Sequence, residues 1–143
     1  MSKTFIGSMW PQVLTLLIVF MVLAPVFAQE VHVRDHDADW LAPPEAAMRA
    51  NPLAGRTDAV AGGRKLFHQR CSQCHRDDGH GTAKAPDLTQ LGVQAQTDGA
   101  LYWKISGGNS RQGMPAFSFL PAPQRWQLVL ELRAMAPRSS ELR

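Results

Sequence analysis

The stretch GGRKLFHQRCSQCH, residues 62–75, decides how the rest of the 143-residue chain is interpreted. Leu66 and Phe67 share one face of the helix that this stretch predicts, and Cys71 follows about one turn later. The stretch ends in CSQCH, residues 71–75, which contains the only two cysteines of the chain. Two thiols with two residues between them, followed at once by an imidazole, form a C-x-x-C-H motif.

Several kinds of site use two closely spaced thiols, and the surrounding sequence distinguishes them. A disulfide between Cys71 and Cys74 would close a very short loop and would stabilise the fold little. A redox-active dithiol would need a βαβ context, which no strand-like pattern in the chain supports. A zinc site would need two further ligands at suitable spacing, and no second cysteine pair exists. Covalent haem attachment is therefore favoured, with zinc, a dithiol and a disulfide as the alternatives.

In a haem site the three groups of the motif have distinct roles. The thiols of Cys71 and Cys74 would reach the two vinyl groups on one edge of the porphyrin. The imidazole of His75 would lie under the iron as the proximal ligand, while its other ring nitrogen donates to an acceptor that orients the ring. One covalently bound haem c, with its iron, is the expected cofactor.

The second axial ligand must come from another segment, and RQGMPAF, residues 111–117, offers the best candidate. The glycine before Met114 permits a close approach of the backbone, and the proline after it keeps Met114 extended. Met114 is therefore the predicted second iron ligand. Four other side chains could compete for this iron position, but other roles explain them better. They are His68 on the attachment helix, His80 in the following loop, Met48 in the arm before the domain and Met135 on the last helix.

The haem domain is expected to be all-α, with three to four short helices and long loops. The loops are predicted over 76–97 and 109–123, which are rich in glycine and proline. No segment shows the alternation of apolar and polar residues that is typical of a strand. A few short helices offer little apolar surface, so the core that they form alone would be marginal. A large, flat and mostly apolar porphyrin would complete that core. The helices are predicted around 45–50, 62–75, 100–106 and 122–136.

The chain divides into four segments by composition. Residues 1–28 are expected to be a signal peptide, because an apolar run of 16 residues ends in small residues suited to cleavage. That run is shorter than the roughly 20 residues that a membrane helix needs, and an uncleaved anchor is the alternative. Residues 29–61 form a Pro-rich arm, 62–137 the haem domain and 138–143 a tail. An exported, periplasmic protein is expected, anchored to the membrane only if the leader is retained.

The charge balance argues against nucleic-acid binding. The formal net charge is +3, and the two propionates of a haem would bring the protein close to neutral. No run of five or more basic residues occurs, so most of them are expected to be solvated. Basic residues around the motif could also steer an acidic partner: they are Lys65, Arg70, Arg76, Lys84 and Lys104.

The segment from 62 to about 137 resembles the class I cytochromes c, particularly small bacterial monohaem members. The resemblance rests on the glycine-to-histidine pattern of 63–75, on the GMPAF loop and on the last helix. It implies that the first and last helices cross closely at Gly63. It also implies that the Pro86 carbonyl accepts from the proximal histidine and that Leu88 packs against the haem. The family usually has an aromatic residue where this chain has Glu131, and Trp126 is expected to supply part of that area.

The resemblance implies one-electron transfer rather than catalysis. The expected partners are redox proteins, namely a dehydrogenase, an oxidase or another cytochrome, and the protein is expected to be a monomer that binds no nucleic acid. The alternative is a haem enzyme or a gas-binding sensor in which the sixth iron position opens. Zinc or disulfide domains without haem remain the third possibility.

Overall fold

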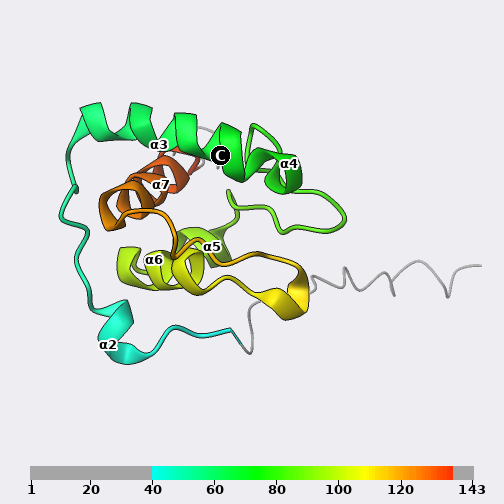
Figure 1. Cartoon of the computed structure of the whole chain (residues 1–143), viewed down its shortest axis with the longest axis horizontal. Helices are drawn as coiled ribbons and strands as arrows, with labels where there is room; N and C mark the ends of the chain where they lie inside the picture. Colours follow the sequence, from blue (N-terminus) through cyan, green and yellow to red (C-terminus); the bar gives the residue numbers. More distant parts are fainter. Residues whose placement is uncertain (1–39, 137–143) are drawn as a thin grey trace, which may run out of the picture. The chain divides into compact units, whose positions relative to one another are not determined.

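The computed structural model describes residues 40–136. The predicted leader, the first part of the arm and the tail at 138–143 lie outside this range. The described part is built from helices and long loops, without a strand, which confirms the all-α prediction (Figure 1). No helix within it is long and apolar enough to cross a membrane. The elements are α2 (Pro44–Ala47), α3 (Thr57–Arg70), α4 (Ser72–His75), α5 (Leu91–Gln94), α6 (Asp98–Gly107), the 3-10 helix η1 (Ser110–Gln112) and α7 (Ala122–Ala134).

The start of α3 and the presence of α5 differ from the sequence prediction. Helix α3 begins at Thr57, five residues before the glycine pair at which a start was predicted. The buried residues Ala59, Gly63 and Phe67 recur every four positions, so the buried stripe of the helix extends back through the segment before the glycines. In addition, the single turn α5 lies within the stretch 76–97 that was predicted as loop.

The local signals around α6 were predictive. Thr97 is the N-cap, and its hydroxyl accepts a hydrogen bond from the backbone N–H of Ala100 at 3.2 Å. The helix ends at Gly107, and Gly108 follows with φ of 63°, a conformation that favours glycine. These two caps fix the ends of α6, which packs against α7 and contributes Leu101, Tyr102 and Ile105 to the core.

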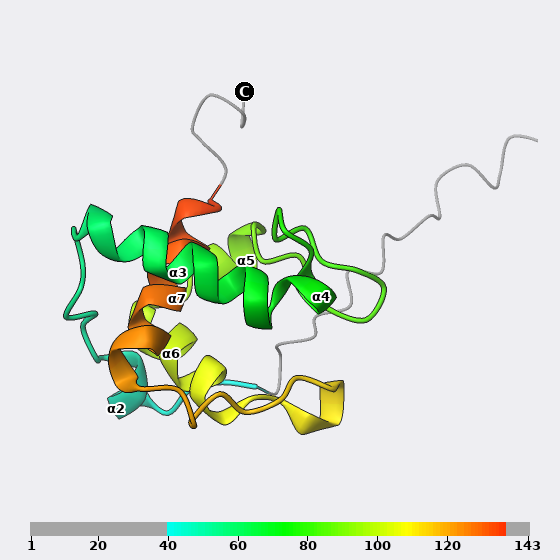
Figure 2. The ribbon, with the colours of Figure 1, turned by 45° about the horizontal axis from the view of Figure 1, so that its top comes forward.

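Helices α3 and α7 cross at the centre of the fold, and the views in Figures 1 and 2 both show them side by side. Gly63 allows this approach, because a Cβ atom there would lie 2.0 Å from the carbonyl oxygen of Gln127. Phe67, Leu128 and Val129 are the largest fully buried side chains, and all three belong to these two helices. The core is therefore anchored on the helix that leads directly into the C-x-x-C-H motif.

Glu131 retains a polar group in this crossing. The residue is only 4% exposed, and Oε1 accepts from Arg64 Nε at 3.3 Å while Oε2 has no hydrogen-bond partner. Trp126 stacks on Tyr102 of α6, with ring centroids 4.0 Å apart. Trp126 thus packs at the contact between α6 and α7. The crossing of α3 and α7 next to Glu131 is close because Gly63 has no side chain.

The described part of the Pro-rich arm packs on the helices. Helix α2 lies against α6, where a Cβ atom on Gly99 would come within 2.2 Å of the Ala46 carbonyl oxygen. The Thr97 hydroxyl donates to the Ala47 carbonyl oxygen at 2.6 Å. The amide of Asn51 donates to the Trp126 carbonyl oxygen at 3.4 Å. Through these contacts the arm forms part of the same folded unit as the haem domain.

The two adjacent glycines of α3 give a matched test of the helix crossing. Gly63→Ala is expected to destabilise the protein by about 2 kcal/mol or more, because the new methyl group meets backbone that cannot move alone. Gly62→Ala meets only the amide end of Gln127, which can rotate away, and it gains roughly 1 kcal/mol of helix propensity. Urea unfolding of the two variants, followed by circular dichroism, checks this. Equal stability of both variants would contradict the close crossing.

Candidate haem site

The C-x-x-C-H motif lies on a short turn at the end of α3. Cys71 is the C-cap of α3 and the N-cap of α4, and its backbone N–H donates to the Phe67 carbonyl oxygen at 2.8 Å. The chain then continues as the single turn α4, in which His75 N–H donates to the Cys71 carbonyl oxygen at 2.9 Å. The helix predicted over 62–75 is therefore interrupted at Cys71. Both thiols and the imidazole are presented from one turn, and neither cysteine is in a disulfide.

The imidazole of His75 is oriented by a backbone acceptor. Its Nδ1 lies 3.1 Å from the carbonyl oxygen of Pro86. A carbonyl oxygen can only accept, so Nδ1 carries the hydrogen and Nε2 keeps a lone pair for a metal. Burial lowers the pKa of His75, while the hydrogen bond to Pro86 acts in the opposite direction. The neutral imidazole that metal binding requires is thus favoured at neutral pH.

The loop after α4 holds Pro86 in this position. Gly81 N–H donates to the His75 carbonyl oxygen at 3.0 Å, and Leu88 N–H donates to the Gly79 carbonyl oxygen at 2.8 Å. Gly81 has φ of 72°, and a Cβ atom on it would lie 2.4 Å from the Ala85 carbonyl oxygen. Only glycine fits such a turn, so the Gly-rich composition of this loop has a specific structural role.

A cavity of about 240 Å³ opens beside the motif. The cavity is much larger than the space that one water molecule needs, and its wall is mostly apolar. The six residues predicted for the site all line it: Cys71, Cys74, His75, Pro86, Leu88 and Met114. The rest of the apolar wall comes from α3, α6, α7 and the loops, and includes Phe67, Val93, Leu101, Ile105, Phe117, Leu128 and Leu132.

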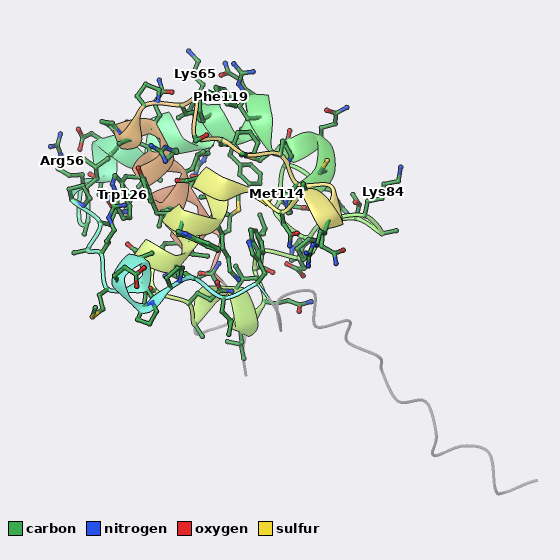
Figure 3. The ribbon with its side chains drawn as sticks, turned by 60° about the horizontal axis from the view of Figure 1, so that its bottom comes forward. Arg56, Lys65, Lys84, Met114, Phe119 and Trp126 are labelled. Carbon is green, nitrogen blue, oxygen red and sulfur yellow. The ribbon has the colours of Figure 1, made fainter. Side chains whose placement is uncertain are left out.

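Met114 reaches the cavity from the loop after η1. Its backbone pairs with Asn109 through two hydrogen bonds of 2.9 and 3.0 Å, and Phe117 N–H donates to the Ile105 carbonyl oxygen at 3.1 Å. These bonds fasten the loop to the end of α6. Figure 3 shows Met114 toward the middle of the molecule, whereas Lys84 projects outward at the rim. Of the methionines within residues 40–136, Met114 alone lines the cavity.

The rival ligands are directed elsewhere. His68 Nδ1 lies 2.8 Å from a carboxylate oxygen of Asp77, and His80 Nδ1 lies 3.3 Å from one of Asp87. Neither histidine lines the cavity. Met48 is 78% exposed, and Met135 packs at the edge of the core.

The thiols do not have the properties of a reactive dithiol. Burial raises the pKa of the Cys71 thiol to about 11, and the neighbouring Cys74 adds to this shift. Redox-active C-x-x-C pairs depend on the opposite, a lowered thiol pKa. Within residues 40–136 no group of three side chains is arranged to hold a metal ion by itself. Two thiols, an oriented neutral imidazole and an apolar cavity instead fit a porphyrin that carries its own iron.

The cavity wall includes residues that the sequence analysis did not assign to the site, among them Trp40 and Lys104. Trp40 lies in the arm, where no site was predicted. Lys104 was named among the basic residues around the motif that could steer an acidic partner, but only 6% of it is exposed. No sequence signal placed either residue at the cavity, because both positions depend on how the arm packs on α6.

This combination of fold, motif and cavity defines a protein of the c-type cytochrome class. Residues 58–130, just over half of the chain, match the family model described as cytochrome C oxidase, cbb3-type, subunit III. The chain belongs to this c-type cytochrome family, which confirms the predicted resemblance and the covalently bound haem c with its iron. Comparisons with curated proteins and with solved structures found no match. Membership of the family supports haem-based electron transfer as the general role.

Proposed function

We propose that this protein is an exported electron carrier, not an enzyme, in which one haem is attached to Cys71 and Cys74. His75 and Met114 are its two axial ligands in this proposal. The main support is that the oriented imidazole of His75 and the thioether of Met114 line the same apolar cavity. With both axial positions filled by the chain, no open iron position is left for a substrate.

The bound haem would supply an iron centre that changes its oxidation state by one electron. The protein's part is to hold that centre and to set its potential. The hydrogen bond from His75 Nδ1 to the Pro86 carbonyl oxygen orients the imidazole ring for the iron. The thioether of Met114 favours the ferrous state relative to a second histidine, and the apolar wall acts in the same direction. We therefore expect a higher reduction potential than for a bis-histidine haem.

The partner is expected to be another redox protein, a dehydrogenase, an oxidase or another cytochrome. Cys74 is exposed, so the attachment edge of the haem would lie near the surface. The side chains of Arg70 and Lys84 beside the cavity are exposed as well and form a cationic rim. Such a cationic rim supports docking to an acidic surface, and the association should weaken as salt is added.

Replacing Met114 with alanine tests the ligand assignment. The ferric protein is expected to lose the weak near-infrared charge-transfer band of a sulfur-ligated haem, and the ferrous protein to bind carbon monoxide readily. Met48→Ala is the control, because Met48 is exposed and does not line the cavity. Rapid carbon monoxide binding by the unmodified protein would instead favour a haem enzyme or a gas sensor.

A further inference from the structure

The side chain of Gln94 joins two residues of the cavity wall. Its amide nitrogen donates to the Leu88 carbonyl oxygen at 2.8 Å and to the Leu132 carbonyl oxygen at 3.0 Å. A carbonyl oxygen can only accept, so both hydrogens of this one amide nitrogen are used. Leu88 and Leu132 line the cavity, whereas Gln94 does not. Gln94 therefore connects two parts of the wall without belonging to it.

The backbone of Gln94 is held by the end of α7. Arg133 donates from Nη1 to the Gln94 carbonyl oxygen at 2.6 Å, and from Nη2 to the Gln96 carbonyl oxygen. Its Nε also donates to a carboxylate oxygen of Asp98 at 2.9 Å. A planar guanidinium that donates to three groups has little freedom to rotate. The short helix α5, in which Gln94 is the last residue, is therefore fixed to the helix that crosses α3.

The contact of Gln94 with Leu88 reaches the loop that orients His75. Leu88 lies two residues after Pro86, whose carbonyl oxygen is the acceptor for His75 Nδ1. Both backbone groups of Leu88 are bound, because its N–H donates to the Gly79 carbonyl oxygen at 2.8 Å and its carbonyl oxygen accepts from Gln94. The segment that carries Pro86 is thus fastened once within its own loop and once to α5, which lies beside that loop in Figure 2.

We propose that Gln94 is a positioning residue of the haem site. Its amide fixes Leu88 against α7, and this keeps the Pro86 carbonyl in place for its hydrogen bond with His75. That hydrogen bond raises the basicity of the nitrogen left for the iron, and a more basic ligand stabilises ferric iron. The proposal rests on the proposed function through His75 as an iron ligand, but it does not depend on Met114 or on the redox partner.

The test compares holoprotein carrying Gln94→Met with holoprotein carrying Gln90→Met. Methionine keeps nearly the length of glutamine but has no donor, and Gln90 is the exposed N-cap residue of α5 without a side-chain cap hydrogen bond. In the ferrous protein, exchange of the His75 Nδ1 hydrogen with solvent, measured by NMR, should become about tenfold faster in Gln94→Met. At a fixed electrode potential, the ferric-to-ferrous ratio should fall about 2- to 5-fold in the same variant. Neither quantity should change in Gln90→Met.

A folded Gln94→Met protein with unchanged His75 exchange and an unchanged potential would overturn the proposal, even if its stability were lower. The unmodified holoprotein gives a second measurement that does not require a variant to fold. The two amide hydrogens of Gln94 should exchange with solvent more slowly than those of the exposed Gln90, because both are bound to carbonyl oxygens. Equal exchange of the two amides would also overturn the proposal. Failure of the haem assignment would be detected separately, as a negative haem stain of the unmodified protein.

Discussion

The double variant Cys71→Ala/Cys74→Ala is expected to reach the export compartment without covalently bound haem. Its intact mass should equal that of the bare polypeptide, and haem staining of a denatured gel should be negative. The physical reason is that these are the only two thiols in the chain, and both lie on the cavity wall. Each single variant should retain one thioether and give a sharply lower yield of holoprotein.

The loss should extend to the fold itself. Without a porphyrin, a cavity of about 240 Å³ with a mostly apolar wall has to fill with water or collapse. We therefore expect the double variant to show reduced helical circular dichroism and a broad thermal transition. Gln73→Ala is the matched control, because Gln73 lies between the two thiols on the same turn and carries no thiol. A double variant with normal yield and a haem-containing mass would contradict attachment at these residues.

The parts of the site that were predictable depend on short stretches of chain. The C-x-x-C-H motif needs only one turn to bring its groups together, so its spacing alone indicated the chemistry. The limits of α6 followed from Thr97 and the glycine pair, because capping groups act on their own helix end. The Met114 loop was recognisable because a glycine and a proline flank the methionine.

The parts that were not predictable depend on contacts between distant segments. The glycine pair of α3 suggested a helix start, but the pair lies inside α3, where Gly63 leaves room for the Gln127 carbonyl of α7. Lys104 is indistinguishable from a surface lysine until Trp40, more than sixty residues earlier, folds against it. Glu131 is buried although carboxylates are usually exposed. Arg64 donates a hydrogen bond to one of its two oxygens, and the other has no partner.

Replacing His75 with glycine should remove the proximal ligand and with it the low-spin spectrum. Nε2 of His75 is the imidazole nitrogen that stays available beside the thiols, since Nδ1 is bound to Pro86. Loss of a protein ligand should lower the yield of holoprotein about tenfold or more. Added imidazole should restore part of the low-spin absorption, because it can enter the space that the missing side chain leaves. Both effects are measured by visible spectroscopy of the purified protein at equal concentration.

The other two histidines of the described residues make this prediction specific. His68 and His80 are held by Asp77 and Asp87 and do not line the cavity. Their replacement by alanine should leave the low-spin spectrum intact, even though each removes an imidazole within ten residues of the motif. If His80→Ala lost the spectrum and His75→Gly kept it, the iron would be bound from the loop instead of from α4. The alignment of His75 by Pro86 would then serve only the packing of that loop.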